Sequence, residues 1–165
     1  MDKQNKQLLS QLIRTQQIAS LGTLDEKQPM VSMVAYTVSD DFSSFYIHIS
    51  GLAKHTKHIA QNPWVGLMIC ESLKSGQDPQ TLARLSVSGH ARVLVPDSDD
   101  YAEVKAGYLN KYPASEISFG LGDFDLYAIE LEQARFVAGF GKTFNLTKQG
   151  LAEVGEVHDQ NISHS

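Results

Sequence analysis

The sequence predicts a mainly β (α+β) protein, a small antiparallel barrel with flanking helices. Segments rich in β-branched and aromatic residues follow one another along the 165-residue chain, and turn residues separate them. The helical segments do not alternate regularly with the strands, which disfavours a doubly wound parallel sheet. With 42% hydrophobic and 20% charged residues, the chain can bury one core of ordinary size.

The first part of the chain predicts one helix followed by adjacent strands. Leu8, Leu9, Leu12 and Ile13 recur at helical spacing, so residues 3–16 should form an amphipathic helix. Strand-like segments then alternate with turn signals, which predicts an antiparallel meander. The predicted strands of this meander are 18–24, 30–38 and 43–50.

The middle of the chain predicts a short helix and two further strands. Residues 52–61 favour a helix, which should end at Asn62-Pro63 because proline restricts the residue before it. Residues 64–71 return to strand composition. Polar and apolar residues alternate from Arg84 to Val95, which predicts a long strand with two unlike faces.

The last part predicts another helix, two strands and a polar tail. Acidic residues open a helix over 97–112, and Pro113 closes it. Two strand-like segments, 123–138 and 142–146, surround the bend Gly139-Phe140-Gly141. We therefore expect six or seven strands in one domain over residues 1–147, and a mobile polar tail over residues 148–165.

Composition restricts the partners and the compartment. A net charge of -5 argues against nucleic acid as a partner. No apolar run is long enough to span a bilayer and the start lacks the apolar centre of a secretion signal, so we expect a cytoplasmic protein without a membrane partner. The single cysteine, Cys70, excludes an intrachain disulfide, and we interpret it as a buried, inert thiol.

The stretch from residue 46 to residue 58 carries the strongest chemical signal. Strand alternation places His48 and Ser50 on one polar face, which continues into a helix start that Ser50 could cap. Lys54, His55, Lys57 and His58 follow in the first two helical turns, where the helix dipole disfavours cations. These cations and free backbone N–H groups would suit a bound phosphate. The alternative interpretation is a solvated basic face.

Other candidates for chemistry are weaker. His55 and His58 are spaced to share a metal, but the neighbouring lysines would repel a cation, and we predict no metal site. Arg84 could recognise a phosphate or a carbonyl edge, or it could be an exposed strand residue. His90 is interpreted as a surface or hydrogen-bonded residue. The Gly139-Phe140-Gly141-Lys142 segment is half of a glycine-rich phosphate loop or simply a tight bend.

Taken together, these segments resemble the flavin-binding split-barrel family of pyridoxamine-phosphate oxidases, and most closely its haem-utilisation branch. The resemblance covers residues 10–147, and its most specific part is the S-x-L-A-x-H-T arrangement before an N-P stop. The matching blocks are IASLGTLD, MVSMVAY, YIHISGLAKHTKHIAQNPWVGLMI, ARLSVSGHARVL, GDFDLYAIEL and AGFGK.

The resemblance implies a six-stranded antiparallel split β-barrel that forms a homodimer, with two FMN sites between the subunits. By this resemblance, Lys54, His55 and Arg84 would hold the flavin phosphate, and His48 and Ser50 would lie near the cofactor. The backbone around Ser32, Met33 and Val34 would face the isoalloxazine ring.

Two features of the C-terminal part bear on the activity. The chain has one tryptophan, Trp64, and lacks the C-terminal tryptophan, arginine and histidine block of the oxidases, so pyridoxamine phosphate is not the expected substrate. In haem-binding relatives a histidine near the C-terminus ligates the iron, and His158 and His164 are the candidates here.

The sequence thus predicts an FMN-binding protein, a flavin-dependent oxidoreductase whose catalytic residues, substrate and electron donor the sequence does not identify. The alternatives are a haem-binding or haem-degrading protein on the same fold, and a non-catalytic carrier of flavin or haem.

Overall fold

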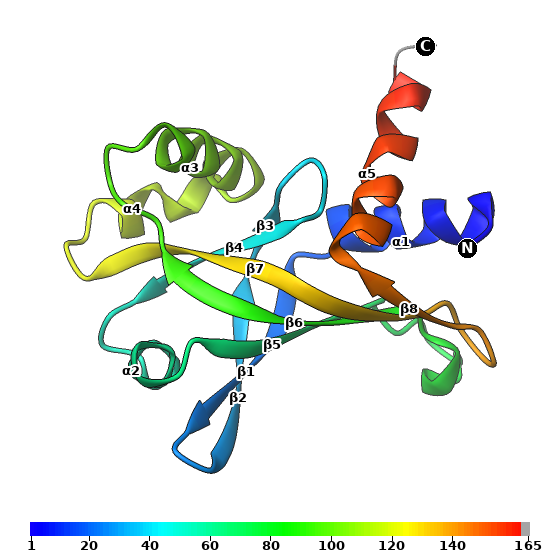
Figure 1. Ribbon diagram of the computed structural model, residues 1–165, viewed down its shortest axis with the longest axis horizontal. Coiled ribbons are helices and arrows are strands. Elements are labelled where there is room, and N and C mark those ends of the chain that lie inside the picture. Colours follow the sequence, from blue (N-terminus) through cyan, green and yellow to red (C-terminus); the bar gives the residue numbers. More distant parts are fainter. Residues whose placement is uncertain (163–165) are drawn as a thin grey trace.

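The computed structural model describes the backbone of residues 1–162 and the side chains of residues 1–155. An eight-stranded antiparallel sheet curls into a half-barrel with helices around it (Figure 1), which confirms the predicted fold class. The strands are β1 (Ile18–Asp25), β2 (Gln28–Ala35), β3 (Thr37–Val38), β4 (Ser44–Ser50), β5 (Trp64–Cys70), β6 (Arg84–Val93), β7 (Phe124–Val137) and β8 (Thr143–Thr147). The helices are α1 (Lys3–Thr15), α2 (Lys54–Gln61), α3 (Asp99–Lys111), α4 (Glu116–Phe119) and α5 (Lys148–Ile162).

The strand order explains the curl. The sheet runs β2-β1-β5-β6-β7-β4-β3, and β8 pairs with β7. One stretch of chain forms both β2 and β3, which lie at opposite ends of this order, so the sheet must bend for the chain to pass between them. The predicted meander is therefore right for β1 and β2, and for β4 it holds only at Thr37–Val38. That strand pairs over seven residues with β7 and over only two with β3, because β7 offers a partner along its whole length.

The passage from β2 to β3 occurs at Tyr36, and the end of α3 holds it in place. The buried Tyr36 hydroxyl donates to the Ile13 carbonyl at 2.7 Å. Lys111 donates to the Tyr36 carbonyl at 3.1 Å, and the Tyr112 hydroxyl donates to the Gln17 carbonyl at 2.6 Å. Burial lowers the pKa of Lys111 to about 8. These contacts tie α1, α3 and the closing point of the half-barrel together.

Two apolar clusters lie on the two sides of β4 and β7. Tyr127 and Ile129 of β7 belong to the main core, together with residues of α1 and α5. Leu126 and Ala128, which alternate with them, pack with residues of α3 and the neighbouring loops.

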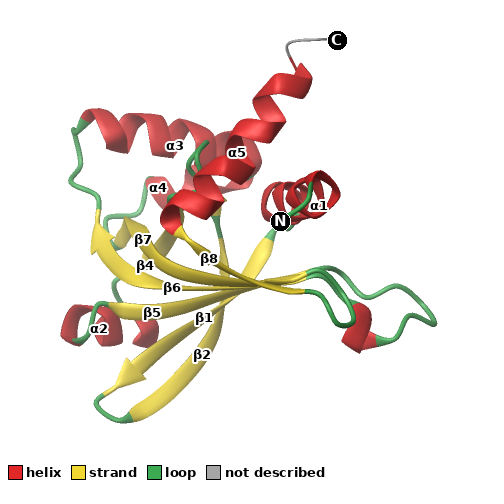
Figure 2. Ribbon diagram, turned by 45° about the vertical axis from the view of Figure 1, so that its right-hand side comes forward, coloured by secondary structure: helices red, strands yellow, loops and turns green. Residues whose placement is uncertain are grey.

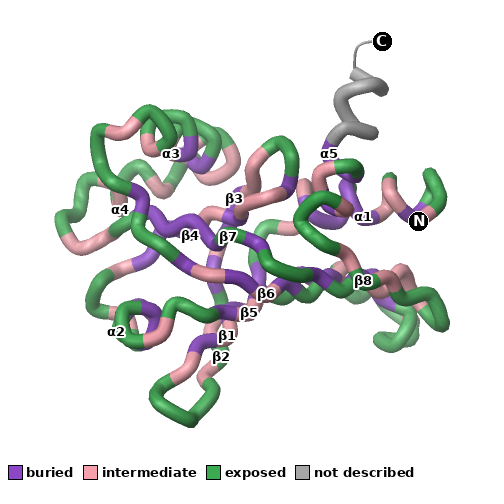
Figure 3. Tube along the Cα trace, in the orientation of Figure 1, coloured by how far each residue is buried: buried purple, intermediate pink, exposed green. Residues whose placement is uncertain are grey.

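The turn between β1 and β2 is exposed (Figure 3). No helix in the described part of the chain is long and apolar enough to cross a membrane.

The segment after residue 147 differs from the expected mobile tail. Residues 148–162 form α5, which lies beside α1 (Figure 1). Leu151 and Val154, three positions apart on one helix face, are fully buried in the same core as Leu9. Lys6 donates to Glu153 at 3.2 Å across the two helices. The apolar face of α5 is narrow and the segment is mainly polar. The hydrophobic periodicity of the sequence therefore does not predict this helix.

Replacement of Leu151 should therefore destabilise the whole domain. We expect Leu151→Ala to lower the free energy of unfolding by about 2 to 5 kcal/mol, because a fully buried leucine is lost and a cavity remains. Glu153→Ala on the same helix should change it by less than about 1 kcal/mol, because its ion pair is exposed. Urea unfolding measures both, and equal effects of the two substitutions would refute the packing of α5 described above.

Candidate functional site

Helix α2 begins without a side-chain cap and with cations in its first turn. Ala53 is the N-cap residue, and among the described residues no side chain accepts a hydrogen bond from the helix start. Lys54 and Lys57 are exposed and border a hollow of about 480 Å³ against the β1–β2 hairpin, which contributes Gln28, Met30 and one carboxylate, Asp25. An uncapped helix N-terminus and two ammonium groups are complementary to an anion.

Ser50 does not cap this helix as predicted. It lies three residues before the N-cap, Ala53, and its hydroxyl donates to an Asp123 carboxylate oxygen at 2.7 Å instead. The same hydroxyl oxygen accepts the Leu52 N–H at 3.1 Å. The turn before α2 is therefore closed by a residue from the start of β7, 73 positions further along the chain.

The two histidines of α2 are directed at the sheet. His55 Nδ1 lies 3.1 Å from Ser32 Oγ on β2, and its Nε2 is buried without a partner among the described residues. Burial, and secondarily His58, lowers the pKa of His55, which favours a neutral ring. His58 Nδ1 lies 3.1 Å from the Thr23 hydroxyl. These contacts anchor α2 on β1 and β2, so Lys54 and Lys57 are the better candidates for binding an anion.

His48 is covered by the loop region that carries α4. Its ring stacks on Phe119 with centroids 3.7 Å apart, and the Ser118 hydroxyl lies 3.3 Å from its Nδ1. Burial lowers the pKa of His48 to about 4, with Asp125 opposing this shift. His48 is therefore a neutral residue of an aromatic cluster that also contains Tyr108 and Phe124.

The outer face of the sheet is accessible along two rows of side chains. The strand register places β2, β1, β5, β6, β7 and β8 side by side, so that each strand contributes one residue to each row. One row is Met33, Ser20, Met68, Ser86, Arg135 and Asn145, and the other is Val31, Gly22, Gly66, Ser88, Gln133 and Thr147. The rows change from apolar at the β2 end to polar at the β8 end.

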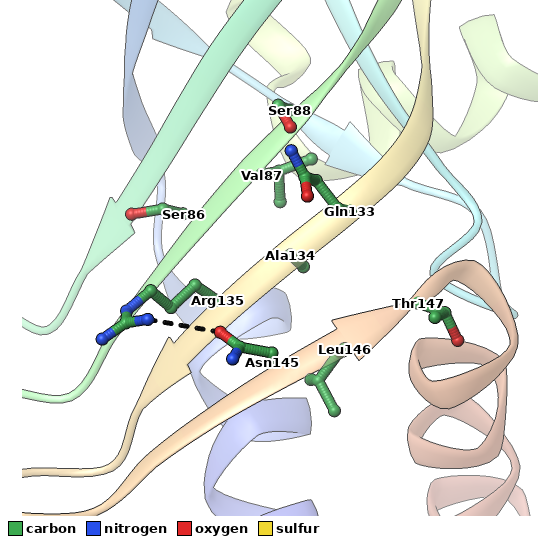
Figure 4. Close-up of a pocket in the computed structure, with 9 residues that line it drawn as sticks. All are labelled: Ser86, Val87, Ser88, Gln133, Ala134, Arg135, Asn145, Leu146 and Thr147. Atoms are coloured by element: carbon green, nitrogen blue, oxygen red, sulfur yellow. Dashed lines mark hydrogen bonds between the residues drawn. The ribbon is translucent and has the colours of Figure 1, made fainter.

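A hollow of about 520 Å³ lies at the polar end of these rows. Figure 4 shows its lining, in which Arg135 donates to the Asn145 side chain at 3.3 Å. An adjoining hollow of about 400 Å³ is bordered by Arg84, Arg135 and the exposed Phe140. Positive φ angles of 108° and 81° at Gly139 and Gly141 form the bend that carries Phe140. Two guanidinium groups therefore lie at this end of the sheet.

The two basic groups lie far apart within one chain. Ser50, beside α2, pairs with Phe124, whereas Arg84 pairs with Val137 at the other end of β7. Thirteen steps along a strand correspond to roughly 40 Å. Figure 2 shows the same separation, with α2 at one end of the sheet and the loops after β5 and β7 at the other. One chain cannot bring Lys54 and Arg84 to the same small ligand.

The remaining predicted residues divide between the two faces of β2. Ser32 and Val34 point inward, and Val34 is buried. Met33 is 65% exposed on the outer face. His158 and His164 lie outside the residues whose side chains are described. Gln133, Arg135 and Asn145 on the outer face were not predicted as site residues. Gln133 and Arg135 pair with residues of β6 that belong to the polar phase of the alternation in the sequence.

Residues 6–138 match the family model of pyridoxamine 5'-phosphate oxidase. The chain belongs to this family. Its relatives include the chloroplastic non-canonical haem oxygenase HOZ of Arabidopsis thaliana, 32% identical over 75% of this chain and 37% of that protein. Haem oxygenase HutZ of Vibrio cholerae is 27% identical over 81% of this chain and 76% of that protein. The chain thus spans little more than a third of the plant relative.

Solved structures share the fold. A haem-binding protein from Mycobacterium smegmatis superimposes with a TM-score of 0.81 at 21% identity, over 100% of this chain and 71% of that one. HutZ of Vibrio cholerae, described as a haem storage protein, gives a TM-score of 0.67 at 24% identity, over 76% of this chain and 89% of that one. The predicted resemblance to the haem-utilisation branch of the oxidase family is confirmed.

The buried His48 should make the stability of the domain depend on pH. Its pKa is about 4 in the folded chain and 6.5 when unperturbed, so unfolding takes up a proton between these values. The free energy of unfolding should therefore fall as the pH is lowered from 6.5 to 4. Chemical unfolding at several pH values measures this fall.

His48→Phe should reduce the fall and keep the stack on Phe119, since the titrating ring is removed. His90→Phe is the matched control, because its ring on the outer face is in contact with solvent in the folded chain. If His48→Phe loses stability as steeply as the parent, His48 is not held neutral by the fold.

Proposed function

We propose that this member of the oxidase family binds haem between two copies of the chain. The observation that carries the proposal is the outer sheet face, which is apolar at one end and carries guanidinium groups at the other. Haem combines a flat apolar ring with two carboxylates, so it needs both kinds of surface. The haem-related names of the relatives support this ligand class.

The apolar end fits a planar ring. Gly22 and Gly66 face each other in register and leave a floor without side chains. Val31, Met33 and Met68 surround this floor and are 72%, 65% and 41% exposed in the single chain. Exposed apolar side chains grouped in this way are typical of a binding surface.

The cations fit the carboxylates only if two chains contribute. Lys54 and Lys57 flank the β1–β2 hairpin that carries Val31, whereas Arg84 and Arg135 lie at the far end of the sheet. In a dimer with two-fold symmetry, the β2 end of each subunit's outer face would lie against the β8 end of the partner's outer face. The arrangement would give two equivalent sites, each with cations from both subunits.

When bound, haem would supply redox and oxygen chemistry, while the protein supplies anchoring, orientation and control of access. FMN is the competing ligand, because the family resemblance maps Lys54, His55 and Arg84 onto residues that hold a flavin phosphate. The visible spectrum separates the two. We expect a Soret band that survives desalting after haem is added, and a stable two-band flavin spectrum instead would favour FMN.

Complementation between subunits tests the shared site. Lys54→Ala and Arg84→Ala should each weaken haem binding by roughly tenfold to a hundredfold, because one charge-assisted contact is lost. A heterodimer of one Lys54→Ala chain and one Arg84→Ala chain carries one intact site and one doubly altered site. It should therefore bind half the haem of the parent at the parent's affinity.

The heterodimer is purified with two different tags and titrated with haem. If both residues served one site within the same chain, neither site would be intact and no binding at the parent's affinity would remain. That result would contradict a site between subunits.

The dimer should depend on the outer face. Met68→Glu places a charge among the exposed apolar residues of β5, and we expect it to shift the protein toward monomer because burial of a charge in the interface is unfavourable. Leu73→Glu is the matched control in the loop after β5, where the leucine is 57% exposed. Sedimentation at micromolar concentration measures the shift, and a dimer that persists in Met68→Glu would place the interface elsewhere.

A further inference from the structure

The turn before α2 already has acceptors for its hydrogen-bond donors. The Ser50 hydroxyl donates to the Asp123 carboxylate at 2.7 Å, and the Gly51 N–H donates to the Asp123 carbonyl at 2.6 Å. The Leu52 N–H donates to Ser50 Oγ, and the Ala53 N–H donates to the Ser50 carbonyl. The donors of this turn are therefore not free, whereas the N-terminus of α2 that follows it has no side-chain cap. Asp123 accounts for two of the turn's four donors.

This turn is the place where the resemblance to flavoproteins puts the phosphate of FMN. A phosphate ester carries a charge of about -1.5 to -2 at neutral pH and needs several donors. Here the Ser50 hydroxyl is held by a carboxylate, so an entering phosphate would meet a like charge and lose a donor. His55, one of the three predicted phosphate ligands with Lys54 and Arg84, is half-buried on Ser32 and favours the neutral form. The Ser50 turn itself therefore offers a phosphate a like charge in place of free donors.

We propose that Asp123 is a specificity-determining residue, a resident carboxylate that excludes phosphate from the Ser50 turn and thereby disfavours FMN. The inference rests on the proposed function, because it gives the reason why this chain would take haem on a fold whose family also serves flavin. A haem carboxylate carries a single charge, and Lys54 and Lys57, which lie outside the turn, outnumber the one carboxylate, Asp25, that lines the same hollow. Asp123 acts on the choice of ligand and on no step of a reaction.

Removal of the charge tests this role. Asp123→Asn keeps the shape and can still accept a hydrogen bond from Ser50. Glu116→Gln in α4 is the matched control, since it gives the same change in net charge from an exposed position nearby. FMN and riboflavin are titrated separately by quenching of flavin fluorescence.

We expect Asp123→Asn to bind FMN at least about tenfold more tightly than the parent, with riboflavin unchanged, because only the phosphate senses the lost charge. Glu116→Gln should bind both flavins like the parent. The proposal is overturned if Asp123→Asn binds FMN like the parent, or if riboflavin gains as much as FMN.

A second measurement distinguishes specific phosphate binding from a general loosening of the fold in the variant. Inorganic phosphate should raise the melting temperature of Asp123→Asn more than that of the parent, since a ligand stabilises the folded state that binds it. Ser50→Ala, which keeps the carboxylate, should show no such gain. An equal response to phosphate in the parent and Asp123→Asn would reject the resident carboxylate.

Haem titration of the same variants separates the two proposals. Unchanged haem binding in Asp123→Asn together with the gain in FMN supports both. Failure of the parent to bind haem would reject the proposed function, while the FMN ratio of Asp123→Asn to parent would still decide the role of Asp123.

Discussion

The length of β7 is the constraint on which the rest of the structure depends. Through Phe124–Glu130 this strand pairs with β4, and through Tyr127–Val137 it pairs with β6. Its alternate residues supply two apolar clusters, one with α1 and α5 and one with α3. Because β7 runs from Phe124, the partner of Ser50, to Val137, the partner of Arg84, it also fixes how far α2 lies from Arg84. The separation of the basic groups follows from this pairing and leads directly to a site built from two chains.

The contacts of Ser50 help to explain why cations are tolerated at the start of α2. The helix start lacks a side-chain cap and carries Lys54 and Lys57, which a folded monomer alone would not favour. Asp123 supplies a carboxylate beside this start, so part of the positive charge is balanced within the chain. The remaining ammonium groups face the β1–β2 hairpin. This arrangement of one carboxylate and two ammonium groups suits a ligand whose single charges lie apart better than a ligand with a compact phosphate.

Features with a local cause could be predicted from the sequence. The spacing of Leu9, Leu12 and Ile13 predicts α1, and the alternation after Arg84 predicts β6, whose buried residues are the apolar ones. Features that depend on distant residues could not be predicted. The pairing of β4 with β7, the contact of Ser50 with Asp123 and the stack of His48 on Phe119 each join segments more than seventy positions apart. Local periodicity carries no information on register, so these contacts require the folded chain.

The distance between α2 of one subunit and Arg84 of its partner tests the shared site most directly. It can be measured in a heterodimer with one spin label at position 54 of one chain and one at position 84 of the other, after Cys70 is replaced by serine. A site between subunits predicts a distance much shorter than the separation of the same two positions within one chain, for which the Phe124–Val137 span of β7, roughly 40 Å, sets the scale. A distance equal to or longer than that separation would contradict it.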